Sequence, residues 1–253
     1  MSVTVAAMAR TIEHTLLRPE ATPQQVDVLC DEALRYGFVG VCVNPIYVRR
    51  AAERLTLTPT LSLEGRRSLK TRRSVGATST HALTTVVVAA VGFPLGANLT
   101  ETKADEARRA IDDGATEIDM VVALGALIAG DRKYVRADIE AVARVVHEAG
   151  QRRLLKVILE TAALTTDQLT LGCRCCAEAE ADFVKTSTGF HARGGATVEH
   201  VRQLHRHASP LRVKAAGGIR TAEAAKAMLE AGAVRIGTSA GVAILEQLRA
   251  LTA

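Results

Sequence analysis

Short apolar runs alternate along the chain with longer amphipathic segments, and this alternation predicts the elements of the fold. The apolar runs are rich in Val, Ile, Leu and Ala and are too short for helices, so they are expected to form strands. The expected strands are residues 11–15, 38–43, 84–92, 116–122, 153–160, 182–186, 211–215 and 233–237. The segments with helical spacing that follow them are residues 23–36, 45–55, 101–113, 132–149, 166–180, 197–207, 221–231 and 239–250.

Capping residues support these boundaries. Thr22, Thr100 and Thr221 stand where helices are expected to begin, and glycines stand where several are expected to end. Eight strands that are each followed by a helix, within 253 residues, are typical of a (β/α)8 TIM barrel, an α/β fold. We therefore expect residues 1–253 to form a single barrel domain. An open doubly wound sheet is the alternative, but no Gly-x-Gly-x-x-Gly motif follows the first strand.

Three lysines stand in similar places near the ends of successive expected strands. Lys156, Lys185 and Lys214 are separated by 29 residues each, which is close to the length of one strand-helix unit. Active sites of TIM barrels collect at the carboxyl ends of the strands. The spacing therefore predicts three lysines at a similar level of one site, although any one of them would be unremarkable as a surface lysine.

Two acidic residues belong to the same region of the predicted barrel. Asp119 lies in an otherwise apolar strand, where a carboxylate needs a partner or backbone hydrogen bonds. Glu160 is four residues after Lys156, so in one continuous strand both side chains face the same side. The sequence leaves open whether these two form a structural ion pair.

Glycine-rich loops predict an anion site. Gly217 and Gly218 follow the seventh strand, and Ser239 follows the eighth strand directly after Gly237 and Thr238. Phosphate groups in TIM barrels commonly bind between these two loops at a helix amino terminus. The loop "TSTG" that follows Lys185 offers further donors to an anion. These loops predict a phosphorylated substrate, although tight turns alone would also use such glycines.

The lysines favour imine chemistry. A lysine that attacks a carbonyl near neutral pH needs its pKa lowered from about 10.4 to about 7. A second ammonium group about 6 Å away contributes roughly two-thirds of the free energy of that change, and burial can supply the rest. Lys185 is the expected nucleophile, because the predicted phosphate-binding loop follows it, and Lys214 and Lys156 are its expected charged neighbours.

Composition and charge narrow the classes of partner. The net charge of +5 comes largely from residues 58–80, where five basic residues stand against Glu64 alone, and this stretch predicts a basic, flexible insertion at the barrel face opposite the chemistry. No aromatic residues are interleaved for stacking on bases, so we expect no nucleic-acid partner. No apolar run is long enough to span a bilayer, and no signal peptide begins the chain, so we expect no membrane partner and a cytoplasmic protein. The five cysteines lack the spacing of a metal site and are expected to be reduced.

The motifs together resemble those of the deoxyribose-phosphate aldolases, a family of class I Schiff-base aldolases. The resemblance covers nearly the whole chain except residues 58–80. The most specific of its motifs are "FVKTSTGF" and, one barrel unit later, "VKAAGGIR". Others are "IEHTLLRPEAT", "VCVNPIYV", "VGFPLGA", "EIDMV", "GALIAGD", "KVILET" and "RIGTSAGVAIL".

The resemblance implies reversible cleavage of 2-deoxy-D-ribose 5-phosphate into D-glyceraldehyde 3-phosphate and acetaldehyde, with no metal and no organic cofactor. It implies that Lys185 forms the imine, that Lys214 tunes it, and that Asp119 transfers protons through water. The residues that match the family's phosphate pocket are Thr188, Gly189, Gly217, Gly218 and Ser239. The residues expected to support the site are Lys156, Cys42 and Glu13. A homo-oligomer, dimer or tetramer, is compatible with the sequence, which does not choose between them.

The chain also departs from the family pattern at several positions. Glu13 stands where an Asp is frequent, Ala123 replaces a frequent Asn, and Ala240 replaces a second Ser of the phosphate loop. The carboxyl end also lacks a terminal Tyr that some members have. Another imine-forming phosphosugar aldolase or a transaldolase stays open as an alternative. A barrel that binds a sugar phosphate without turnover is the alternative from another class.

Overall fold

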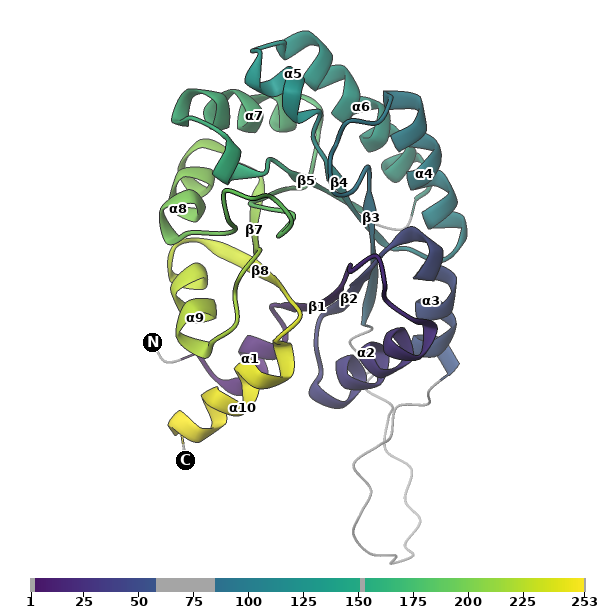
Figure 1. The fold of residues 1–253 in the computed structure, drawn as a ribbon, viewed down its shortest axis with the longest axis vertical. Helices are drawn as coiled ribbons and strands as arrows, with labels where there is room; N and C mark the ends of the chain where they lie inside the picture. Colours follow the sequence, from purple (N-terminus) through teal and green to yellow (C-terminus); the bar gives the residue numbers. More distant parts are fainter. Residues whose placement is uncertain (1–2, 58–84, 151–152, 253) are drawn as a thin grey trace, which may run out of the picture.

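The strands form a closed barrel. A computed structural model describes residues 3–57, 85–150 and 153–252. Eight parallel strands follow one another around this barrel in chain order, and the last pairs with the first. Helices surround the strands on the outside (Figure 1). The predicted (β/α)8 architecture is thus confirmed, and the alternative of an open doubly wound sheet is wrong.

The strand boundaries agree closely with the apolar runs. The strands are β1 (Ile12–Leu16), β2 (Gly40–Val43), β3 (Val86–Val91), β4 (Glu117–Val121), β5 (Leu154–Ile158), β6 (Phe183–Lys185), β7 (Arg212–Ala216) and β8 (Ala233–Thr238). No strand extends more than one residue beyond its predicted range. The agreement is good because a barrel strand is covered by helices on one face and by the barrel interior on the other, which concentrates apolar residues in it.

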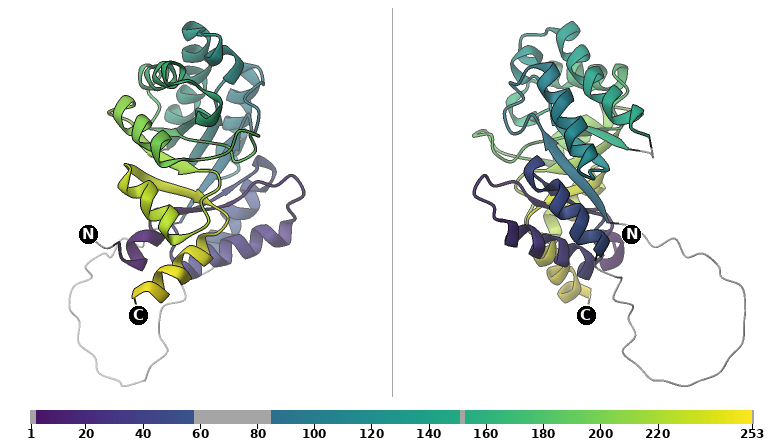
Figure 2. Two further views of the ribbon diagram at one scale, coloured as in Figure 1. Left: turned by 60° about the vertical axis from the view of Figure 1, so that its left-hand side comes forward. Right: turned by 90° about the vertical axis from the view of Figure 1, so that its right-hand side faces the viewer.

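The predicted helices are present too. They are α2 (Pro23–Tyr36), α3 (Val48–Leu57), α4 (Thr100–Asp112), α6 (Arg132–Glu148), α7 (Thr166–Glu178), α8 (Val198–His207), α9 (Ala222–Glu230) and α10 (Gly241–Thr252). Short elements were not predicted because they hold too few residues to show a period: α1 (Val5–Ala9), α5 (Leu124–Ile128) and the 3-10 turns η1 (Pro45–Tyr47) and η2 (Thr161–Ala163). Helices α1 and α10 pack against each other, so the two described ends of the chain lie close together (Figure 2).

Two of the three predicted caps are confirmed. The side chains of Thr22 and Thr221 accept hydrogen bonds from the first turns of α2 and α9. The third prediction is wrong, because Leu99 is the N-cap of α4 and Thr100 is already helical. The Thr100 hydroxyl instead donates to Asp138 of α6 at 2.9 Å.

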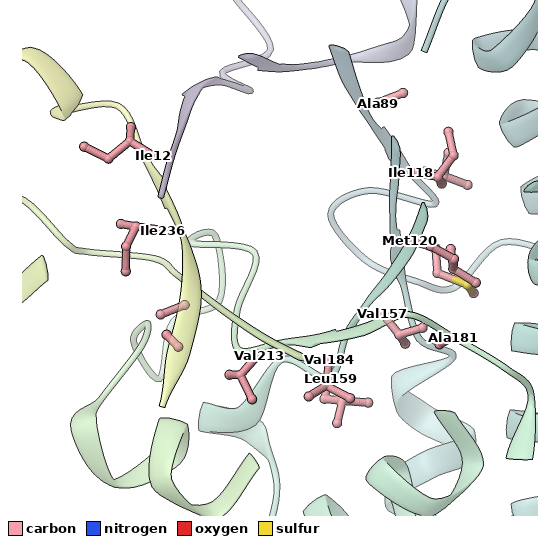
Figure 3. Packing of buried hydrophobic residues seen from close by; sticks show 14 of the residues in the cluster. Ile12, Ala89, Ile118, Met120, Val157, Leu159, Ala181, Val184, Val213 and Ile236 are labelled. Atoms are coloured by element: carbon pink, nitrogen blue, oxygen red, sulfur yellow. The ribbon is translucent and has the colours of Figure 1, made fainter. Parts of the chain in front are cut away.

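Most of the apolar core lies between the strands and the helices. Figure 3 shows that Ile118 and Met120 of β4, Val157 of β5 and Val213 of β7 point outward from the strands. Residues one position away in the same strands therefore point into the barrel, since side chains alternate along a strand. This alternation decides which polar residues reach the interior.

The barrel interior has an apolar side and a charged side. Leu17, Cys42, Val88 and Ala90 form a small buried cluster, separate from the main core, on the side of β1 to β3. The buried charged residues of the strands come from β4 to β7, apart from Glu13 of β1.

The predicted basic insertion at residues 58–80 lies outside the described residues. The described chain stops at Leu57, the last residue of α3, and resumes at Thr85, just before β3. Thr85 directly precedes the amino end of β3, whereas Lys185 is at the carboxyl end of β6. The assignment of residues 1–253 to a single domain stays a prediction.

Candidate active site

The three predicted lysines all lie inside the barrel. Lys156, Lys185 and Lys214 are at most 2% exposed. Lys185 and Lys214 are direct partners in the register of β6 and β7. Lys156 is opposite Phe183, two residues before Lys185, so it sits one inward-facing position deeper. The prediction of a similar level is confirmed for one pair and is wrong for the third lysine.

Asp119 is the centre of the lysine cluster. Its Oδ2 atom lies 2.7 Å from Nζ of Lys185 and 2.6 Å from Nζ of Lys214. Its Oδ1 atom lies 3.0 Å from Nζ of Lys156. The carboxylate that the apolar strand made conspicuous therefore binds all three lysines at once, which is how a fully buried charge is compensated.

Two more carboxylates and an arginine complete the cluster. Nζ of Lys156 lies 2.6 Å from Glu117, and Lys214 contacts Glu13, the predicted supporting residue. Arg235 lies 3.6 Å from Glu13 and 3.5 Å from Glu117. Sequence reasoning missed Glu117 and Arg235, although each is two positions from an inward-facing residue of its own strand. Together with the central carboxylate, three anionic side chains face four cationic ones in this cluster.

The carboxylates of the cluster strongly affect the pKa values of the buried groups. Burial opposes ionisation of Asp119, but the attraction of Lys156, Lys185 and Lys214 outweighs the burial and holds its pKa well below the ordinary value. Burial also disfavours the charge of Lys214, yet Asp119 and Glu13 outweigh it and raise the pKa of this lysine. Lys156 acts in the opposite direction and lowers the pKa of Lys214, as expected of a neighbouring ammonium group, but the two carboxylates outweigh it.

The prediction that Glu160 and Lys156 share one continuous strand and face the same side of it is wrong. Strand β5 ends at Ile158, and Glu160 has a left-handed backbone, with φ 47° and ψ 58°. This conformation breaks the alternation on which the prediction relied. Lys156 pairs with the cluster in the barrel, while the Glu160 carboxylate accepts hydrogen bonds from the N–H and the hydroxyl of Thr188.

A cavity of about 790 Å³ opens at the carboxyl ends of the strands. Lys185 lines it, whereas Lys156 and Lys214 are not among the described residues that do so. All of the predicted phosphate-pocket residues line this same cavity: Thr188, Gly189, Gly217, Gly218 and Ser239. Gly217 has φ 98°, and a methyl group on it would come within 3.4 Å of Gly189, Gly195 and Ser187. The close approach of these loops therefore requires glycine at this position.

Other residues of the cavity were not predicted. His14 is 3% exposed, and its Nε2 atom lies 2.7 Å from Glu32. Phe190 also lines the cavity and meets Phe93 edge to face, with the ring centres 5.2 Å apart. The outer-facing position of His14 on its strand gave no reason to place it at the cavity. Arg220 also lines the cavity and ends the quoted motif "AAGGIR", so its place in that loop was the available indication.

Cys42, the remaining predicted supporting residue, lies on the apolar side of the barrel interior. It is fully buried, and burial raises the pKa of its thiol to about 11. The thiol therefore acts as a small apolar group rather than a nucleophile. All five cysteines are free and buried, as expected for reduced residues. In residues 3–57, 85–150 and 153–252, no group of three or more His, Cys, Asp and Glu side chains is arranged to hold a metal ion.

Two of the departures from the family pattern have visible consequences. Ala123 is the N-cap of α5, and that helix begins without a side-chain hydrogen bond to its first turn. The N–H of Ala240 donates to the hydroxyl of Thr238 at 2.9 Å, which keeps the loop before α10 closed without a second serine. The phosphate loop therefore retains its backbone arrangement.

Comparison with known proteins gives a consistent result. The sequence matches the DeoC/LacD family of aldolases over residues 5–247. It is 49% identical to the deoxyribose-phosphate aldolase of Thermococcus gammatolerans over 243 residues, which cover 96% of each chain. It is 46% identical to that of Brevibacillus brevis, with 94% of this chain and 95% of the relative covered. The tetrameric deoxyribose-phosphate aldolase of Aeropyrum pernix has a similar structure, with a TM-score of 0.82 and 30% sequence identity, and the match covers 98% of this chain and 93% of that one.

None of the described helices combines the length and the apolar character needed to cross a membrane.

Proposed function

Because the chain belongs to the DeoC/LacD family of aldolases, we propose that it reversibly cleaves 2-deoxy-D-ribose 5-phosphate into D-glyceraldehyde 3-phosphate and acetaldehyde. The reaction is a class I aldol cleavage, in which a lysine imine accepts the electrons of the broken bond. Lys185 forms this imine, because it is the lysine that reaches the cavity. That single observation carries the assignment.

The ion pairs of the cluster support the same choice. Lys156 contacts three carboxylates and Lys214 contacts two, whereas Lys185 contacts Asp119 alone among the described residues. Deprotonation of Lys185 therefore breaks one ion pair and leaves equal numbers of cations and anions in the cluster. Deprotonation of Lys156 or Lys214 would break more ion pairs and would leave more buried carboxylates without that cationic partner.

The bond changes follow from this placement. The neutral amine of Lys185 attacks C1 of the open-chain sugar, and loss of water gives the iminium. The C3 hydroxyl loses its proton, the C2–C3 bond breaks, and its electrons form an enamine as glyceraldehyde 3-phosphate leaves. The enamine takes a proton at C2, and water releases acetaldehyde and the amine. Asp119 transfers the protons through water, since its Oδ2 atom is within 2.7 Å of Lys185 Nζ.

Lys214 tunes this step as a cation. Its raised pKa keeps it protonated, so it holds Asp119 ionised and oriented rather than acting as a second nucleophile. Glu13 in turn contacts Lys214. A methyl group on Gly237 would lie 3.1 Å from Cε of Lys214, so the glycine leaves room for this lysine's side chain.

The test is reduction with borohydride in the presence of acetaldehyde, followed by peptide mapping. An ethyl group adds about 28 Da by atom counting, and we expect it on Lys185. Lys185→Arg should abolish the adduct, since guanidinium stays protonated, and Lys214→Arg should slow its formation without moving it. An adduct on Lys214 or Lys156 would reverse the roles, and the absence of any adduct would refute the imine mechanism. The cleavage assay is run with and without EDTA, and equal rates are expected.

The substrate phosphate binds between the loops of Gly189, Gly217, Gly218 and Ser239, which all line the cavity. Gly217→Val should reduce cleavage of 2-deoxyribose 5-phosphate far more than cleavage of unphosphorylated 2-deoxyribose. Equal losses with both sugars would place the phosphate elsewhere.

We also propose that the protein is a cytoplasmic homo-oligomer. The Aeropyrum pernix relative is a tetramer, and the free, buried cysteines suit a reducing compartment. Light scattering coupled to size-exclusion chromatography should give a mass of two or four chains, and a monomer at micromolar concentration would refute this state.

A further inference from the structure

Glu160 is a buried acid that the proposed reaction does not use. It is 2% exposed, and its backbone is left-handed, which is unfavourable for a residue with a side chain. One other non-glycine residue of the described ranges has a positive φ, Glu180, and it is exposed beyond the end of α7. A strained backbone at a buried acid beside a catalytic loop therefore needs its own explanation.

The carboxylate of Glu160 holds the loop that follows Lys185. Its Oε2 atom accepts hydrogen bonds from the N–H of Thr188, at 3.3 Å, and from the Thr188 hydroxyl. The neighbouring backbone joins the same loop, since the N–H of Thr161 donates to the carbonyl of Thr186 at 2.8 Å. The left-handed turn is thus the point from which the end of β5 fixes the loop after β6.

These hydrogen bonds determine which hydrogen-bonding capacity the Thr188 hydroxyl retains for a ligand in the cavity that it lines. A hydroxyl has one hydrogen to donate and two lone pairs. The Thr188 hydroxyl donates its hydrogen to Glu160, and one lone pair accepts the N–H of Phe190 at 3.1 Å. The remaining lone pair can accept a hydrogen bond from a substrate hydroxyl but cannot donate to a phosphate oxygen.

We propose that Glu160 is a positioning residue that fixes the loop after Lys185 and commits the Thr188 hydroxyl to accept from a substrate hydroxyl. The role rests on the proposed aldolase reaction. In the direction of synthesis the acceptor is glyceraldehyde 3-phosphate, whose one free hydroxyl is at C2. Glu160 therefore makes the site favour acceptor aldehydes that carry this hydroxyl.

The decisive variant is Glu160→Gly, because glycine adopts the same left-handed backbone without strain while the acceptor for Thr188 is lost. We expect kcat/KM for 2-deoxyribose 5-phosphate to fall about ten- to hundredfold, the range for a lost hydrogen bond to a charged group. Glu160→Gln keeps an acceptor oxygen and should lose about three- to tenfold. Glu180→Gly removes the other left-handed glutamate and is the matched control, with activity expected to be unchanged.

Three further measurements separate positioning from a simple turn. In Thr188→Val, kcat/KM should fall as much as in Glu160→Gly. In the double variant it should fall no further, since the two residues act as one hydrogen-bonded unit. The wild type should prefer glyceraldehyde 3-phosphate to its analogue without the C2 hydroxyl, and Glu160→Gly should reduce that preference at least about fivefold. Borohydride trapping of acetaldehyde on Lys185 should persist in both variants.

The outcomes distinguish the two proposals. Full activity and unchanged acceptor preference in Glu160→Gly would show that Glu160 only forms a turn and would overturn the inference. If that variant unfolds at a much lower temperature, Glu160→Gln decides, and wild-type kcat/KM and preference in it would overturn the inference as well. A wild-type protein without turnover and without an adduct would refute the proposed function instead.

Discussion

Removal of the charge of Asp119 tests the electrostatics of the whole cluster. In Asp119→Asn, Lys185 and Lys214 keep their places but lose the carboxylate between them. Both Nζ atoms lie within 2.7 Å of the same oxygen, so they are separated by less than about 5.4 Å, twice that distance. At an effective dielectric constant of about 20, two charges at this separation repel by about 3 kcal/mol. This repulsion shifts the equilibrium between the charged and the neutral amine of Lys185 about 150-fold toward the neutral amine.

Two measurements on this variant should move in opposite directions. Turnover of 2-deoxyribose 5-phosphate should fall at least about 100-fold, because the group that transfers protons is lost. Trapping of acetaldehyde by borohydride should persist and should extend to lower pH than in the wild type, because the repulsion favours the neutral nucleophile.

The matched control is Asp138→Asn. Asp138 is also fully buried and also pairs with a lysine, Lys103 at 2.7 Å, but this pair lies between α4 and α6, outside the barrel interior. It should lower stability without changing the pH range of trapping. Turnover of Asp119→Asn within a few fold of the wild type would refute the proton-transfer role. A trapping range moved to higher pH would refute the electrostatic reasoning.

Other predictions concern stability. Asp138→Ala leaves the buried Lys103 without its partner and should lower the free energy of unfolding by about 3–5 kcal/mol in urea titrations. Ala123→Asn supplies the missing side-chain cap of α5 and should raise it by about 0.5–1 kcal/mol in the same titrations. The pKa of Asp119 is lowered, so its stabilisation is complete above its unfolded pKa of about 3.9 and is lost as pH falls through the lower folded value. The pKa of Lys214 is raised, so its stabilisation is complete below about 10.4 and is lost as pH rises through the higher folded value. Melting temperatures measured from pH 2 to pH 12, compared with those of Asp119→Asn and Lys214→Met, should show the two losses at opposite ends of the range.

The sequence alone determined the architecture and the candidate nucleophile. Strand and helix boundaries were readable because each barrel strand is a short apolar run and each helix is amphipathic over several turns. Caps such as Thr22 act on neighbouring residues only, so local sequence is sufficient to place them. Lys185 was identifiable because a strand, a lysine and a small-residue loop follow one another directly in the chain.

The tertiary structure alone decided how the charges meet. Asp119 reaches three lysines, and Glu117 and Arg235 join the cluster, because the closure and register of eight strands bring their inward-facing positions together. Register and stagger between strands are set by the packing of the whole barrel and leave no local trace in any one segment. The turn at Glu160 could not be predicted from the sequence for a related reason. A left-handed glutamate is locally unfavourable, so it persists only where contacts from another strand, here those with Thr188, outweigh its cost.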